Sequence, residues 1–113
     1  MLTIEALKEF GADTEQGLQR CRNKKVFYIK IVGMGIQDKN FDELKPLLEA
    51  KDFGRAFEVT HALKGVLGNL ALTPILEPVE EMTEALRARK DIDYMPLYEK
   101  MMERLGVLRS LAV

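Results

Sequence analysis

The stretch of sequence that decides the fold is DFGRAFEVTHALKGVLGNLAL, residues 52–72. On a helical wheel with about 100° per residue, the apolar positions of this stretch fall on one side. They are Ala56, Val59, Leu63, Leu67 and Leu70, with Phe53 and Phe57 toward one margin. Asp52 stands where an N-cap residue is expected. The stretch therefore predicts a long amphipathic helix from Phe53 to about Leu72, with its apolar side in a core.

Helical spacing of apolar residues extends over most of the remaining chain. Capping residues divide it: Asp13 with Gln16, Asn40 with Glu43, a capping Thr73 followed by Pro74, and Asp93. A proline at position 46 lies beyond the first turn of its helix and removes one backbone bond there. The predicted helices are Leu2 to Phe10, ended by Gly11, then Asp13 toward Arg22, Asn40 through Leu48, Thr73 to about Lys90, and Asp93 through Leu108.

Residues 25–32, KVFYIKIV, are ambiguous because β-branched and aromatic residues favour a strand. No other segment is typical of a strand, and a lone strand would leave its backbone groups unpaired. Val26, Ile29, Val32 and Ile36 also fit a helical stripe. We therefore predict a helix here, and an all-α fold. The architecture expected for the single domain 1–113 is an antiparallel up-down four-helix bundle with an additional short N-terminal helix or helices.

The composition excludes several classes of protein. The 113 residues include 17 Lys and Arg, 18 Asp and Glu, one His and one Cys, for a net charge of −1. A near-zero net charge argues against broad nucleic-acid binding. One Cys with one His gives neither a disulfide nor a conventional zinc site. Ser110, the only serine, lies far in sequence from His61, which argues against a Ser–His hydrolase.

The chain has no signal-peptide pattern at its N-terminus and no run of roughly 18 apolar residues. We expect a free-standing cytoplasmic protein with no membrane contact and with Cys21 as a reduced, packed thiol. No heptad pattern persists long enough for a coiled coil, so a monomer is the default expectation.

The single histidine lies beyond the apolar margin of the 52–72 helix, about 40° past Phe57. Gly54, Gly65 and Gly68 project to within about 40° of its direction, although glycine inside a helix costs about 1 kcal/mol relative to alanine. Lys64 lies three residues after His61, at i+3, and is therefore its neighbour on the same face of the helix. These spacings predict an accessible imidazole with a cation one turn away and open space around it.

This arrangement suits a transient phosphate carrier. Imidazole is nucleophilic near neutral pH because its unperturbed pKa is about 6.5. A phosphoryl group on the ring adds negative charge, which Lys64 can offset. The other reacting groups, a magnesium site and a carboxylate, would come from a partner, and the chain itself would bind no metal and no stable cofactor.

The run His61-Ala62-Leu63-Lys64-Gly65-Val66-Leu67-Gly68-Asn69-Leu70 resembles the signature of histidine-containing phosphotransfer (HPt) domains of two-component phosphorelays. The resemblance extends across nearly the whole chain. One departure is Ala71-Leu72, which stand where Gly-Ala is usual; a change at the helix end is expected to matter little. Another is Thr83, which falls where the family often has a glutamine that hydrogen-bonds the active histidine.

The resemblance implies a fold, a function and roles for particular residues. His61 would be the phosphorylated residue and Lys64 would steady the phosphoryl group. The partners implied are response-regulator receiver domains or a hybrid histidine kinase, with Mg²⁺ on the receiver domain. The partner-docking residues implied or expected on that surface are Gly54, Gly65, Gly68, Thr83 and Arg87.

The alternative is a non-catalytic helical interaction module with the same fold. Without an ATP-binding segment, the chain would be a carrier and not a kinase. Gly33-Met34-Gly35 lacks the rest of a phosphate-binding loop and is expected to be a helix irregularity or a close-packing site. The carboxylates of Glu80, Glu81 and Glu84 are expected to form a solvated helix face.

Overall fold

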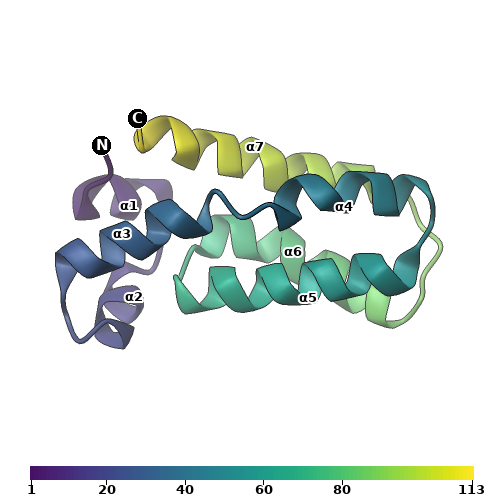
Figure 1. The fold of residues 1–113 in the computed structure, drawn as a ribbon, viewed down its shortest axis with the longest axis horizontal. Helices are drawn as coiled ribbons and strands as arrows, with labels where there is room; N and C mark the ends of the chain where they lie inside the picture. The colour runs from purple at the N-terminus through teal and green to yellow at the C-terminus, as the bar shows by residue number, and fades with distance from the viewer.

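The computed structural model describes residues 1–113 as seven α-helices without a strand. No helix is both long enough and apolar enough to span a membrane. The helices are α1 (Ile4–Phe10), α2 (Thr14–Arg20), α3 (Lys25–Gly35), α4 (Asn40–Glu49), α5 (Phe53–Asn69), α6 (Thr73–Arg87) and α7 (Met95–Leu111) (Figure 1).

The last four helices form an antiparallel up-down bundle. The helix α5 packs against α4 and α6, and α7 packs against α6 and α4. Figure 1 shows α1–α3 gathered at one end of this bundle. The predicted all-α bundle with additional N-terminal helices is therefore confirmed. Its fully buried side chains include Phe41, Leu44, Leu63, Leu67, Ile75, Met82, Leu86 and Met101.

The central helix α5 forms as its sequence predicts. The side chain of Asp52 accepts a hydrogen bond from the Arg55 amide at 3.3 Å and caps the first turn. The face of α5 that points into the core carries Ala56, Thr60, Leu63 and Leu67. Burying each of the two leucines stabilises the fold by about 1.5–3 kcal/mol. This face fixes the rotation of α5 and turns the opposite face toward solvent.

The ambiguous segment is helical, but the stripe predicted for it is partly wrong. The buried residues on this side of the chain are Tyr28, Val32 and Ile36, while Val26 is 83% exposed. The face is set by Tyr28, whose hydroxyl donates a buried hydrogen bond to the Leu70 carbonyl at 2.7 Å. An aromatic ring with a polar tip needs such a partner when it is buried.

The N-terminal helices are bound to the C-terminal end of α5 by hydrogen bonds to carbonyls in its last turn and in the residues that follow it. In addition to Tyr28, the Asp13 amide donates to the Ala71 carbonyl at 2.9 Å, and the Arg20 guanidinium donates to the Gly68 carbonyl. The cation of Arg20 also matches the negative end of the α5 dipole.

Two glycines allow this close approach. A Cβ atom at Gly17 would lie 2.5 Å from Tyr28 Oη, and one at Gly35 would collide with the Leu70 side chain. The prediction of a close-packing site at Gly33 to Gly35 therefore holds for Gly35. It does not hold for Gly33, beside which there is open space.

Three local expectations need correction. Thr73 opens α6 but provides no side-chain cap, since the N-cap position is Leu72. At α4, Asn40 is the first helical residue and the N-cap position is Lys39, so Asn40 is not the cap; its amide donates to Asp38 Oδ1 at 2.8 Å. Ala71 has a φ of 57°, in the left-handed region that favours glycine. Its departure from the family pattern is therefore a strained position and not a neutral change.

Candidate functional site

His61 is the middle residue of α5 and is exposed to solvent. Its imidazole stacks on the ring of Phe57, one turn earlier, with ring centroids 5.6 Å apart and an angle of 22° between the planes. Phe57 supports one side of the imidazole without enclosing it. The ring is therefore held in place and remains open to a reacting partner.

A hollow of about 330 Å³ opens beside His61, lined by Arg20, His61, Lys64, Gly65, Gly68 and Asn69. A Cβ atom added at Gly65 or Gly68 would meet nothing within 4 Å. The two glycines are thus not required by packing within the chain. They leave room for another surface to approach the backbone of α5.

Charged groups on α6 complete the surroundings of His61. Lys64 Nζ lies 3.9 Å from Glu84 Oε2, and Arg87 Nε lies 3.4 Å from Glu84 Oε1. The Arg87 guanidinium lies over the ring of Phe57, 5.0 Å from its centroid. One carboxylate therefore serves two cations. These pairs are at least one-third exposed, and pairs of this kind contribute at most about 1 kcal/mol, so either cation can exchange Glu84 for another anion.

A family model described as the Hpt domain matches residues 37–110. The chain belongs to the Hpt domain family. No curated protein and no solved structure matches the chain. Hpt domains take part in histidine phosphotransfer in two-component signalling, and they are phosphotransfer carriers and not kinases.

The match covers α4, α5 and α6 and nearly all of α7, and it leaves out α1, α2 and α3. The Hpt-domain part therefore contains His61, Lys64, Glu84 and Arg87. It does not contain Arg20, which reaches the hollow from α2.

The structure places only some of the predicted docking residues at the His61 hollow. Gly65 and Gly68 line the hollow, and Arg87 lies beside it on Phe57. Gly54 lies outside the hollow, where an added Cβ would be 3.7 Å from Arg89 Nη1. The docking role expected for Thr83 is wrong, because Thr83 is fully buried and its hydroxyl donates to the Val79 carbonyl at 2.7 Å.

Two charged groups of this site, Glu84 and Arg20, do not follow from the sequence pattern. Glu84 lies on an exposed face, as expected, but it also pairs with Lys64 and Arg87 there. Arg20 lies 41 positions before His61, and no local spacing connects the two residues. Both come from helices other than α5, so only the packing of the helices brings them to the hollow.

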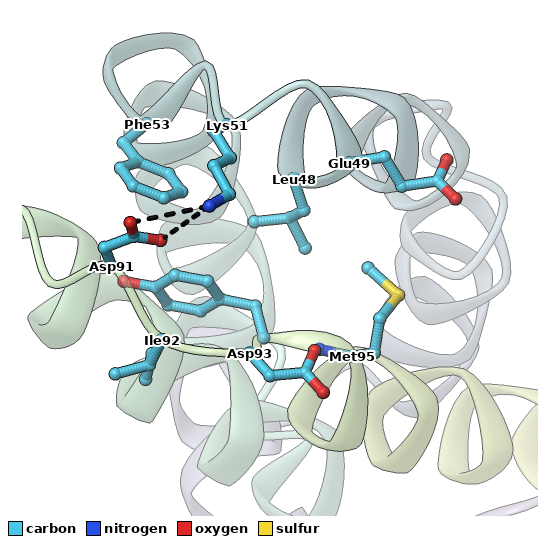
Figure 2. Close-up of a pocket in the computed structure, with 9 residues that line it drawn as sticks. Leu48, Glu49, Lys51, Phe53, Asp91, Ile92, Asp93 and Met95 are labelled. Carbon is cyan, nitrogen blue, oxygen red and sulfur yellow. Dashed lines mark hydrogen bonds and ion pairs between the residues drawn. The ribbon is translucent and has the colours of Figure 1, made fainter.

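A second hollow, of about 440 Å³, opens near the start of α5 (Figure 2). There Lys51 Nζ lies 3.3 Å from Asp91 Oδ1, and Figure 2 shows the ammonium in contact with both carboxylate oxygens. The rings of Phe53 and Tyr94 lie 5.7 Å apart beside this pair. Lys51 and Asp91 thus neutralise each other within this hollow. No group of three or more His, Cys, Asp or Glu side chains in the chain could hold a metal ion.

Proposed function

We propose that the chain is a phosphorelay intermediate, which receives a phosphoryl group on His61 from an aspartyl phosphate of one receiver domain and passes it to another. The observation that carries the proposal is the open, supported imidazole of His61 beside Lys64 and two glycines that leave the approach clear. Membership of the Hpt domain family supports the same reading.

In the first step, an unprotonated ring nitrogen of His61 attacks the phosphorus of the aspartyl phosphate. A phosphorus–nitrogen bond forms while the bond from phosphorus to the aspartate oxygen breaks, and the aspartate leaves as a carboxylate. Transfer to the second receiver reverses these changes, with an aspartate oxygen as the attacking atom. The chain needs one accepting nitrogen, and the single histidine supplies it.

Lys64 offsets the charge that the phosphoryl group brings. In the resting protein its ammonium lies beside Glu84, which is the nearest anion. A phosphoryl group carries more negative charge and more acceptor oxygens than a carboxylate, so Lys64 would leave Glu84 for it. Arg87 keeps its contact with Glu84 and with Phe57, and thereby holds the stacked support of His61.

The partner would supply the remaining groups. The Mg²⁺ ion and the reacting aspartate belong to the receiver domain in this proposal, whether that domain is free or part of a hybrid histidine kinase. The openings at Gly65 and Gly68 admit the partner close to α5. A monomeric cytoplasmic protein of one domain, without stably bound cofactor, remains our expectation.

The test is direct phosphoryl transfer. The chain is incubated with a receiver domain that has been charged with radiolabelled acetyl phosphate, in the presence of Mg²⁺. The expected result is an acid-labile, alkali-stable label on the chain and none on the His61→Gln variant. If the wild-type chain takes no label from any receiver domain of its own organism, the non-catalytic interaction module becomes the better account. If the variant takes label as well as the wild type, His61 is the wrong residue.

A further inference from the structure

The near-neutral net charge conceals a strongly basic segment. Residues 17–37 hold five lysines and arginines and no aspartate or glutamate. All five cations are exposed, and none takes part in an ion pair of the structure. They are Arg20, Arg22, Lys24, Lys25 and Lys30. The family match does not explain these five cations, because all of them lie before residue 37.

The basic segment is continuous with the His61 hollow. Where α2 turns into α3, a hollow of about 330 Å³ is lined by Arg20, Cys21, Arg22, Lys24 and Phe27. Arg20 also lines the hollow that contains His61. The two hollows therefore meet at this one side chain, whose guanidinium is hydrogen-bonded to the Gly68 carbonyl of α5.

The turn that carries these cations is held in a fixed shape. Arg22 and Asn23 have φ angles of 54° and 59°, in the left-handed region that such residues rarely adopt. The Asn23 amide donates to the Leu18 carbonyl at 2.7 Å, and Tyr28 binds the following helix to Leu70. The cations thus keep a defined position relative to α5 and His61.

An apolar side chain stands beside the charges. Phe27 is 51% exposed, lines the basic hollow, and has Val26 next to it at 83% exposure. Exposed aromatic residues next to arginines are typical of protein–protein contact sites, where an aromatic anchor is surrounded by polar groups. A surface that only repelled other cations, or only kept the chain soluble, would not need Phe27 exposed.

We infer that this surface, made by Arg20, Arg22, Lys24, Lys25 and Phe27, binds the acidic face of the receiver domain that exchanges phosphate with His61. The inference rests on the proposed function. A receiver domain that holds Mg²⁺ and a reacting aspartate must present several carboxylates around that aspartate. Opposite charges on two docking faces steer the encounter and raise its rate. The surface adjoins the His61 hollow, so one partner can cover both.

The test compares two double variants with the same change in charge. In the first, Arg22→Glu is combined with Lys24→Glu; in the control, Lys45→Glu on α4 is combined with Lys100→Glu on α7, where both lysines are exposed and unpaired. The measurement is the second-order rate constant for transfer from a receiver domain charged with acetyl phosphate, at several salt concentrations.

We expect the rate constant of the first variant to fall about tenfold at low salt and its salt dependence to weaken. The control should stay within about twofold of wild type. Equal losses in both variants, or no loss in either, would overturn the inference. A Phe27→Ala variant checks the apolar contact without a change in charge, and we expect a several-fold lower rate constant from it as well.

Two further arms separate this inference from the proposed function. Phosphoramidate, a small donor, should label His61 equally in wild type and in every docking variant. Failure of the wild type to take label from either donor would count against the proposed function, whereas equal transfer by all variants would count against the docking surface alone. Binding of duplex DNA or phosphatidylserine vesicles that the first variant loses, with unchanged transfer, would assign the surface to another ligand and overturn the inference.

Discussion

Two hollows open along α5, and their charges are arranged in opposite ways. Near the start of α5, Lys51 and Asp91 neutralise each other directly, beside the packed rings of Phe53 and Tyr94 (Figure 2). From the middle of α5 toward its C-terminal end, Lys64 shares Glu84 with Arg87, and His61 is exposed. The first hollow is the larger, at about 440 Å³ against about 330 Å³. Size therefore does not mark the hollow that we propose to be functional, whereas the exposed imidazole of His61 and the open backbone at Gly65 and Gly68 do.

The largest expected effect comes from closing the His61 hollow. Gly65→Leu adds a side chain where the structure has open space, so it should block the partner and lower the transfer rate more than tenfold. The same change should raise the free energy of unfolding by up to about 1 kcal/mol, because leucine favours a helix more than glycine does. Transfer assays and urea unfolding measure the two effects.

The matched control is Gly106→Leu on α7, where an added Cβ would also meet nothing. It should stabilise the chain to a similar extent and leave transfer unchanged. A Gly65→Leu variant that transfers phosphate at the wild-type rate would show that the openness of the hollow is not used.

The next largest effect is expected at Lys64, and the lysine of the other hollow, Lys51, is its control. Lys64→Gln should lower the transfer rate about tenfold, which corresponds to about 1.4 kcal/mol, because the phosphoryl group loses its cation. Lys51→Gln removes a lysine whose partner is Asp91 and should leave the rate within about twofold. Equal losses from both variants would mean that general charge, and not the His61 surroundings, controls transfer.

A third prediction concerns the attachment of the N-terminal helices to the C-terminal end of α5. Burial, with smaller effects from Cys21 and Asp13, raises the pKa of Tyr28 from 10.0 to about 12. The folded state favours the neutral phenol, so this contribution to stability is complete below pH 10 and is lost as the pH rises toward 12. Tyr28→Phe should cost about 1 kcal/mol at neutral pH, since its hydrogen bond to Leu70 is lost.

Urea unfolding of wild type and Tyr28→Phe between pH 8 and pH 11.5 provides the measurement. The wild type should lose more stability than the variant over the alkaline part of this range. Parallel losses in the two proteins would show that other groups, such as Tyr94 and Tyr98 with their raised pKa values, dominate the alkaline response.

The smallest effect is expected at Glu84, whose carboxylate pairs with both Lys64 and Arg87. Glu84→Gln frees Lys64 and removes a negative charge near the phosphoryl group, so phosphorylated His61 should persist about two- to threefold longer. Glu81→Gln is the control, because Glu81 is exposed on the same helix and has no ion-pair partner. Identical lifetimes for the Glu84→Gln variant and the wild type would contradict the exchange of partners by Lys64.

The sequence predicts the parts of the site that share one helix and fails on those brought by others. The positions of His61, Lys64, Gly65 and Gly68 on one exposed face follow from helical geometry, since they lie within seven residues of one another. The docking role predicted for Thr83 is wrong for the same reason, because Thr83 lies on α6 and not on α5. One residue along a helix turns the side chain by about 100°, so only the packed structure decides that Glu84, and not Thr83, faces Lys64.

The N-terminal helices show the other limit. Their helical character could be predicted because no second strand was present to pair with residues 25–32. Their position could not be predicted, because it depends on hydrogen bonds from Asp13, Arg20 and Tyr28 to carbonyls about 40 to 60 residues later in the chain. Arg20 becomes part of the His61 hollow only through that attachment.

The measurement that tests the central claim most directly is the location of the phosphoryl group itself. The chain is phosphorylated by a charged receiver domain, kept at alkaline pH, and analysed by phosphorus NMR and by mass spectrometry of its peptides. The account predicts one phosphoryl group, bonded to nitrogen, on the peptide that contains His61. A phosphoryl group on oxygen, on any other peptide, or on none despite phosphate loss from the receiver would contradict it.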